Sequence, residues 1–350
     1  MPSIRSVMGA VVVGLLATVT ALPAAQKMSP YERRAYEFGQ LARKHMLEER
    51  QNPTTGLPDG LTDVDILELC VVSLINLIPL WFDFHGLTHN SALTLENLET
   101  AFYQQGFAKF PDSDFAALGL APQEITNLKS IGGTEATHVT TLTSAIAGAG
   151  TAPVAPCTYN FAFTDAKSMV ATAAVLENVG VSAYLAAAPL VKTPGILTVA
   201  AEIVTVEARH QTFIRTASRV AAIPSAFDTP LGIRAVFTLA AGFISSCPAG
   251  SNLAITPFPA LTMTAGAPAG AVAAGSTVQL SSTATGATGC AFVNGGLPGG
   301  AAFTSFANGA CTVPPNLAGV TYVHLTSATP TDGTLTDAIT VAGPMVMTIS

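Results

Sequence analysis

The chain has 350 residues and a formal net charge of −7, with 49% hydrophobic and only 11% charged residues. A chain so poor in charge and acidic in balance lacks the basic face that nucleic-acid binding requires, so no nucleic-acid partner is expected. Beyond the N-terminus no uninterrupted apolar run reaches the roughly 20 residues of a spanning helix, so the mature chain is expected to contain no membrane span.

The N-terminus is typical of a secretory signal. Arg5 is followed by an apolar stretch from Val7 to Val19 and then by small residues up to Ala25. This pattern predicts a signal peptide over residues 1–25, and therefore a secreted, extracellular protein. A membrane anchor is the alternative, although the apolar stretch is short for one.

Residues 26–91 are expected to form an N-terminal helix and a linker. Charged residues are concentrated over 29–51, which favours an amphipathic helix at the periphery of the fold. Residues 68–91 are different, because they are apolar and carry the only Trp of the chain, Trp81. His85 and His89 stand four residues apart there and could form a metal pair, but Gly86 makes a continuous helix doubtful.

From about residue 92 to 247 the sequence predicts long helices with a weak internal repeat. LENLETAFY starts at Leu95 and LENVGVSAY starts at Leu176, so that Glu96 aligns with Glu177 and Tyr103 with Tyr184. Each copy is followed by a Glu-x-x-His motif, first in TEATH (Glu135 and His138) and then in VEARH (Glu207 and His210). With 12 Glu and 6 His in the chain, fewer than one such spacing is expected by chance.

Helix geometry gives this pattern a chemical meaning. Residues i and i+3 share one face of a helix, so each Glu-x-x-His motif presents a carboxylate and an imidazole together. A four-helix bundle would bring four carboxylates and two imidazoles to one point, which is a ligand set for two iron or manganese ions. The expected metal ligands are Glu96, Glu135, His138, Glu177, Glu207 and His210.

Three neighbours of these residues leave alternatives open. Glu99 lies one turn after Glu96 and could replace it as a ligand, although its counterpart in the repeat is Gly180. Tyr103 and Tyr184 follow their glutamates by seven residues, on nearly the same helix face. They are either hydrogen-bond donors to the ligand carboxylates or ordinary core tyrosines.

The composition changes after residue 255. Residues 255–350 contain no Lys, Arg or Glu, and short β-branched runs alternate there with turn residues. This predicts a small β-sandwich over 255–350, and its low charge favours association with a cell wall or surface. Of the five cysteines, pairing within each domain, Cys157 with Cys247 and Cys290 with Cys311, keeps loop closure local and leaves Cys70 over.

The motifs LTLENLETAFY, EATHVTTL, LENVGVSAYLAAAPLV and ILTVAAEIVTVEARHQTFIR resemble the fungal secreted ferritin-like family of stress-response and desiccation-related proteins. The resemblance implies an α+β multidomain fold, a ferritin-like four-helix bundle followed by a small C-terminal β-sandwich, with the six residues above as ligands. In that family a DVDIL-like start runs almost directly into the ALTLE-like helix. Residues 68–91 are therefore interpreted as an atypical insert, with a membrane-dipping or partner-binding segment as an alternative.

Three functions fit the sequence. The first is a secreted di-metal carboxylate protein with oxidase- or peroxidase-like chemistry towards oxygen, peroxide or ferrous iron. The second is a non-catalytic structural or cell-surface stress protein whose metal site is vestigial or purely structural. The third, an iron-storage cage, is disfavoured by the signal peptide, the fused sandwich and the low charge. Whether the protein is an enzyme stays open.

Overall fold

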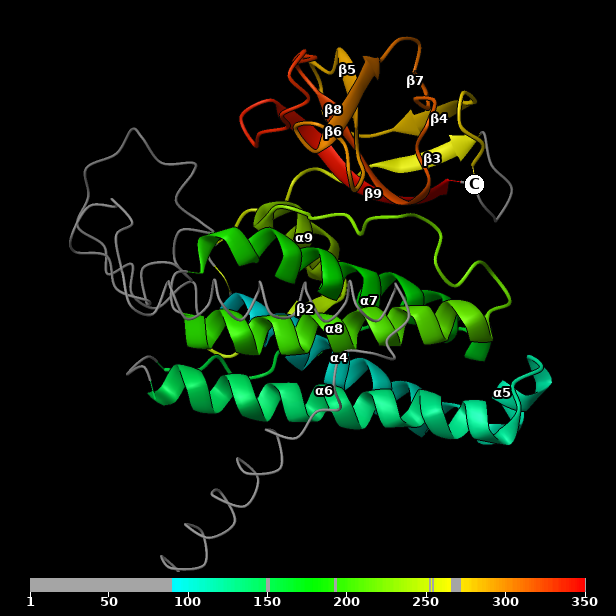
Figure 1. The fold of residues 1–350 in the computed structure, drawn as a ribbon, viewed down its shortest axis with the longest axis vertical. Coiled ribbons are helices and arrows are strands. Elements are labelled where there is room, and N and C mark those ends of the chain that lie inside the picture. The colour runs from blue at the N-terminus through cyan, green and yellow to red at the C-terminus, as the bar shows by residue number, and fades with distance from the viewer. Residues whose placement is uncertain are drawn as a thin grey trace, which may run out of the picture. The chain divides into compact units, whose positions relative to one another are not determined.

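The computed structural model describes residues 90–148, 152–191, 194–251, 253, 255–265 and 272–349. Four long helices run alongside one another in the first half of this part of the chain (Figure 1). They are α4 (Asn90–Lys109), α6 (Pro122–Gly148), α7 (Ala166–Ala187) and α8 (Pro194–Ala217). Shorter helical elements are α5 (Asp112–Ala117), the 3-10 helix η3 (Ala188–Leu190) and α9 (Ile233–Ala241).

Local signals explain where these helices begin. Pro122 and Pro194 are the first residues of α6 and α8, a position where the missing N–H costs nothing. Asp165 caps α7 by accepting a hydrogen bond from the Ser168 backbone N–H at 2.6 Å, and the Ser168 hydroxyl lies 3.1 Å from the Asp165 backbone N–H. This reciprocal pair satisfies two otherwise unpaired donors at the start of the helix.

Helix α7 is the most apolar of the four. Among the described helices it alone is long and apolar enough to cross a membrane by length and composition, and most of it is buried inside the protein. The apolar composition is therefore that of a core helix.

Two glycines allow the helices to approach closely. A Cβ at Gly106 of α4 would stand 2.3 Å from the Met169 side chain of α7, and a Cβ at Gly132 of α6 would stand 2.8 Å from Tyr103 of α4. Around these contacts Phe102, Phe115, Leu128 and Ile214 form a buried core. Because these two positions have no side chain, α4 packs closely against α7 and α6.

The second half of the chain is built from antiparallel strands. One sheet has the order β3-β4-β7 and the other the order β6-β5-β8-β9. The bounds are β3 (Thr262–Ala265), β4 (Thr277–Ser281), β5 (Gly289–Val293), β6 (Ala301–Ser305), β7 (Ala310–Thr312), β8 (Gly319–Thr326) and β9 (Thr340–Ile349). A further short pair, β1 (Thr158–Tyr159) with β2 (Ile244–Ser246), lies in the helical part of the sequence.

Strand β5 shows how the sheets are packed, because all five of its residues are buried. Cys290 and Phe292 join side chains of the other sheet, including Val278, in one hydrophobic core. Ala291 and Val293 point the other way and pack with Val179 of α7. Successive side chains of a strand alternate between its faces, so β5 belongs both to a sandwich core and to the contact with the helices.

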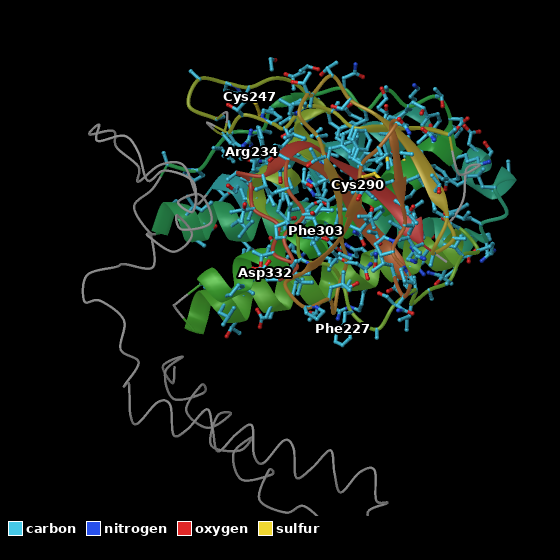
Figure 2. All side chains as sticks on the ribbon, turned by 90° about the horizontal axis from the view of Figure 1, so that it is seen from above. Phe227, Arg234, Cys247, Cys290, Phe303 and Asp332 are labelled. Atoms are coloured by element: carbon cyan, nitrogen blue, oxygen red, sulfur yellow. A yellow bond between two sulfur atoms is a disulfide. The ribbon has the colours of Figure 1, made fainter. Side chains whose placement is uncertain are left out.

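Two disulfides form within the two parts, Cys157–Cys247 and Cys290–Cys311. One cysteine of each pair, Cys247 and Cys290, is marked in Figure 2. The first bond stands beside the β1–β2 pair, and the second joins β5 of one sheet to β7 of the other. Both pairings expected from the sequence are confirmed.

The fold class expected from the sequence is also confirmed, since a helical bundle is followed by antiparallel sheets. The signal peptide over 1–25, the helix over 29–51, Cys70, His85 and His89 lie outside the described residues. So does the interpreted insert over 68–91, except for Asn90 and Ser91, which are the first residues of α4.

Candidate metal centre

The six residues expected as ligands come from the four long helices and meet inside the bundle. Glu96 lies on α4, Glu135 and His138 on α6, Glu177 on α7, and Glu207 and His210 on α8. None of the six is more than 8% exposed. Burying four carboxylates without partners would be very costly, so their arrangement needs a physical explanation.

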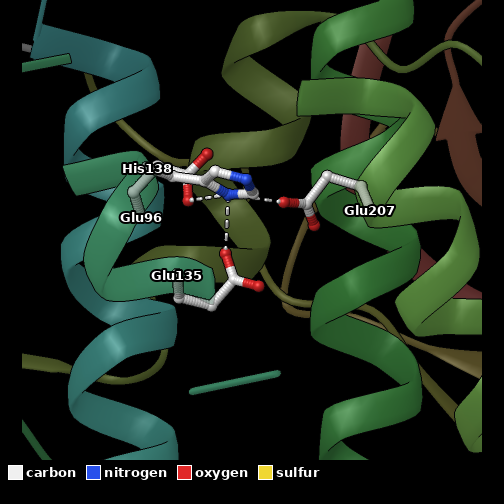
Figure 3. A group of neighbouring side chains, drawn as sticks. All are labelled: Glu96, Glu135, His138 and Glu207. Atoms are coloured by element: carbon white, nitrogen blue, oxygen red, sulfur yellow. Dashed lines mark hydrogen bonds and ion pairs between the residues drawn. The ribbon is translucent and has the colours of Figure 1, made fainter. Parts of the chain in front are cut away.

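One half of the cluster is centred on His138. Its Nδ1 atom lies 3.2 Å from Glu96 Oε2, 3.1 Å from Glu135 Oε2 and 3.2 Å from Glu207 Oε1 (Figure 3). The three oxygens come from three different helices, α4, α6 and α8. A single Nδ1–H can donate a good hydrogen bond to only one of them at a time.

The other half is centred on His210 and mirrors the first. Its Nδ1 atom lies 2.8 Å from Glu135 Oε1 and 3.1 Å from Glu177 Oε2. The two imidazole rings are stacked with their centroids 6.4 Å apart. Glu135 therefore reaches both histidines, one with each carboxylate oxygen.

Together the side chains form two overlapping groups of four. One group is Glu96, Glu135, His138 and Glu207, and the other is Glu135, Glu177, Glu207 and His210, with the ligand atoms of each group within 4.8 Å of one another. Glu135 and Glu207 belong to both groups. Two metal ions bridged by shared carboxylates would need this connectivity.

The hydrogen bonding of the shared carboxylates tests whether metal ions fit. Glu135 Oε1 and both carboxylate oxygens of Glu207 are buried and accept no hydrogen bond from the described residues, although histidine Nδ1 atoms lie near them. Buried carboxylate oxygens are normally satisfied by donors or by cations. The oxygens without a hydrogen bond belong to the two residues that both groups share, so the cluster could hold two metal ions.

The two tyrosines of the repeat support this cluster by crossing between helices. The Tyr103 hydroxyl on α4 donates to Glu177 Oε1 on α7, and the Tyr184 hydroxyl on α7 donates to Glu96 Oε1 on α4 at 2.5 Å. Each tyrosine therefore holds the glutamate of the other repeat. Of the two roles open from the sequence, donors to the ligand carboxylates and plain core tyrosines, the first is confirmed.

Burial and hydrogen bonding compete in the electrostatics of the cluster: burial alone would raise the pKa of Glu135, but hydrogen bonds with His138 and His210 lower it to about 2. Desolvation raises the pKa of Glu96 to about 7, and it also raises the pKa values of Glu177 and Glu207. Burial by itself would lower the histidine pKa values, but hydrogen bonds with the surrounding glutamates raise the pKa of His138 to about 12 and that of His210 to about 10. Without metal, the cluster thus retains protons on both kinds of side chain.

Glu99 is a seventh acidic residue at the centre. A Cβ at position 180 would lie 3.3 Å from Glu99 Oε1 and 2.9 Å from Glu207 Oε2, so both carboxylates occupy the space beside the bare backbone of Gly180. Glu99 is buried but belongs to neither group of four. It stands beside the cluster in addition to Glu96, not in its place.

A second layer of residues was not expected from the sequence. Gln211, next to His210, donates to the side chain of Asn178, next to Glu177. Asn178 in turn donates to the Tyr322 hydroxyl of β8 at 2.6 Å, and Ser182 lies 2.7 Å from the same hydroxyl. The sheet therefore contacts α7 directly behind the cluster. Only the adjacency of Asn178 and Gln211 to ligands could have indicated this role.

The family comparison agrees with this geometry. Residues 88–219 match the family model described as a ferritin-like domain. Residues 88–219 therefore form a ferritin-like domain. Comparison with curated proteins found no match. The match ends near the end of α8, so it covers the four long helices with the short strand β1 between them, and it does not cover α9 or strands β2 to β9.

Proposed function

We propose that the ferritin-like domain holds two iron or manganese ions through Glu96, Glu135, His138, Glu177, Glu207 and His210. The observation that carries the proposal is the pair of overlapping groups that share Glu135 and Glu207, because Glu135 Oε1 and both carboxylate oxygens of Glu207 accept no hydrogen bond from the described residues. Four carboxylates and two imidazoles favour iron or manganese over copper, and structural zinc sites usually include cysteine.

The domain's residues would each perform a distinct task at such a centre. Glu135 and Glu207 would bridge, Glu96 with His138 and Glu177 with His210 would complete the two positions, and the tyrosine hydroxyls would fix the carboxylates. The packed helices keep water away from the cluster. Bound iron or manganese would supply redox chemistry towards dioxygen, peroxide or ferrous iron.

The protein is further proposed to act outside the cell, in the manner of the secreted stress-response and desiccation-related proteins that its motifs resemble. The signal-like residues 1–25 and two disulfides, which indicate an oxidising environment, support secretion. The β-sandwich with only two charged residues supports association with a cell wall or surface.

A purely structural metal centre is the second candidate. It is favoured by the complete burial of Glu135, Glu177 and Glu207, because a closed site suits ions that staple four helices together. The two candidates differ in redox behaviour and not in metal content, so both can be tested in one preparation.

The test is elemental analysis of the purified protein and of three variants. The native protein should contain two iron or manganese ions per chain, and His210→Ala and Glu177→Ala should lose one or both. Glu202→Ala is the matched control, because Glu202 is exposed on the same helix as His210. Negligible metal in the native protein, or unchanged content in both site variants, would overturn the proposal.

Redox activity then separates the two candidates. Reduced, metal-loaded protein should react with dioxygen or peroxide if the centre is catalytic, whereas ions that neither react nor exchange would support the structural reading.

A further inference from the structure

A small cavity lies beside the cluster, between α4, α7 and the segment around α9. Its volume is about 100 Å³, and eight apolar side chains line it together with the single carboxylate of Glu99. Its three walls include Leu98 from α4, Val179 from α7 and Phe243, which follows α9. None of these wall residues takes part in the ligand set, so the cavity is a feature separate from the two groups of four.

Glu99 connects the cavity to the cluster. It lines the cavity, and its Oε1 atom approaches the backbone at Gly180, the same spot that Glu207 Oε2 approaches from the cluster side. Only the side chain of Glu99 therefore stands between the cavity and the shared carboxylate of Glu207. The other copy of the repeat, with Gly180 at this position, supplies no such carboxylate.

The lining determines what the cavity can hold. A buried water molecule needs two to four polar partners, and here Glu99 is the single polar lining residue. Apolar cavities of about 150 Å³ are known to stay dry and to bind benzene or xenon. A cavity of about 100 Å³ suits a smaller guest of the same chemistry.

We propose that this cavity binds a small apolar molecule of the size of dioxygen and supplies it to the metal centre past Glu99. The binding itself depends only on the shape and lining of the cavity. The supply step rests on the proposed function, because it requires metal ions at the cluster. Glu99 is a positioning residue in this scheme, since its side chain separates the apolar cavity from the charged ligands.

Xenon tests the binding in protein without metal. ¹²⁹Xe NMR titration, or a crystal under xenon pressure, should reveal one xenon atom between Leu98, Val179 and Phe243. Ala240→Leu adds a side chain at a lining position and should abolish xenon binding. Ala241→Leu, the same change one residue along α9 at a position outside the lining, should retain it.

A second filling variant protects the test against misfolding. Val175→Phe closes the cavity from α7 and should give the same loss as Ala240→Leu. Absence of xenon from the native protein, or equal xenon binding in the filled and control variants, overturns the inference.

Kinetics of the metal-loaded protein test the supply step. If the cavity feeds the centre, Ala240→Leu should raise KM for dioxygen several-fold with unchanged metal content and kcat, and Ala241→Leu should not. Xenon binding with identical KM values in both variants overturns the supply step. A native protein that binds xenon but no metal refutes the proposed function and leaves the cavity site established.

Discussion

At the scale of single residues, the two tyrosine hydroxyls link the two copies of the sequence repeat, because each donates a hydrogen bond to the glutamate of the other copy. Tyr103 and Tyr184 each hold a glutamate on the opposite helix, and Tyr103 is buried while Tyr184 is half-buried. Residues that orient metal ligands in this way affect metal affinity without touching the ion.

Tyr103→Phe and Tyr184→Phe are each expected to weaken metal binding by roughly 10- to 100-fold. The ring stays in place, so packing is preserved while one carboxylate loses its donor. Tyr159→Phe is the control, because Tyr159 is also buried but its hydroxyl only accepts a bond from the Cys157 N–H at 3.2 Å. Metal affinity measured by chelator competition checks this, and equal affinities in all three variants would contradict it.

His324 is a residue-scale feature of the sheet. It is 1% exposed on β8, and neither ring nitrogen has a hydrogen-bond partner among the described residues. Burial lowers its pKa from 6.5 to about 3. The neutral ring is therefore retained in the folded protein at pH values where the unfolded chain binds a proton.

His324 should make the protein less stable in acid. Above pH 6.5 the imidazole is neutral in both states, and as the pH falls from 6.5 towards about 3 only the unfolded state gains the proton. The free energy of unfolding therefore falls as the pH drops from 6.5 towards about 3, by up to about 1.4 kcal/mol per pH unit from this imidazole. His324→Leu should remove this component and be at least as stable at pH 7, since an unsatisfied buried group is lost.

Urea unfolding of metal-free native protein and His324→Leu between pH 4 and 7 measures this difference. The glutamates and histidines of the metal-free cluster contribute equally to the pH dependence of the unfolding free energy in both proteins, so their contribution cancels in the comparison. Parallel stability curves would refute the assignment.

At the scale of elements, Gly180 of α7 leaves room for two carboxylates that reach it from the neighbouring helices, Glu99 of α4 and Glu207 of α8. In an open helix, Gly→Ala stabilises by about 1 kcal/mol. At position 180 the added methyl would stand 2.9 Å from Glu207 Oε2, which is closer than real Cβ contacts allow, so a bridging carboxylate must move.

Gly180→Ala is therefore expected to lower metal content while retaining the fold. Gly133→Ala on α6 is the matched control, because its Cβ would meet nothing within 4 Å. That control should keep both ions and gain up to about 1 kcal/mol of stability. Elemental analysis measures the metal content of both variants, and thermal unfolding measures their stability. Full metal content in Gly180→Ala would contradict the expected displacement of the Glu207 carboxylate.

At the scale of the whole molecule, metal binding and folding stability are linked. Metal ions that bind only the folded state stabilise it, by about 2.7 kcal/mol when the free ion is at 100 times its Kd. The ligands must be deprotonated to bind, so this stabilisation grows with pH.

Removing the metal should cost more stability at high pH. In the metal-free protein the raised pKa of Glu96, about 7, gives stability that is complete below 4.5 and lost as the pH rises through 7. The raised histidine pKa values act in the same direction, because their contribution to stability is complete below pH 6.5 and is lost as the pH rises from there towards 10 for His210 and 12 for His138. The difference in Tm between loaded and chelator-treated protein should therefore widen from pH 5 to pH 8.

Glu177→Ala serves as the control for this measurement, because it should lose one or both ions and chelator should therefore change its Tm less than that of the native protein. A chelator effect of the same size at every pH would contradict the expected link between protonation and metal binding.

Much of the site could be predicted from local geometry. The spacing of Glu135 to His138 and of Glu207 to His210 fixes each pair on one helix face whatever the helix packs against. The alternation of side chains in the C-terminal strands and the pairing of cysteines within each part are likewise properties of nearby residues or of loop closure. These features needed no knowledge of how the helices are packed.

What the sequence by itself determined is thus the residues of the buried Glu/His cluster, the succession of bundle and sheets, and the disulfides. Only the tertiary structure decided that Tyr103 serves Glu177 and not its own neighbour Glu96, that Glu99 faces a cavity, and that Tyr322 contacts Asn178. The physical reason is that residues on different helices meet according to the rotation and offset of the helices. Those are set by side-chain packing, such as Gly132 against Tyr103, and no spacing along the chain records them.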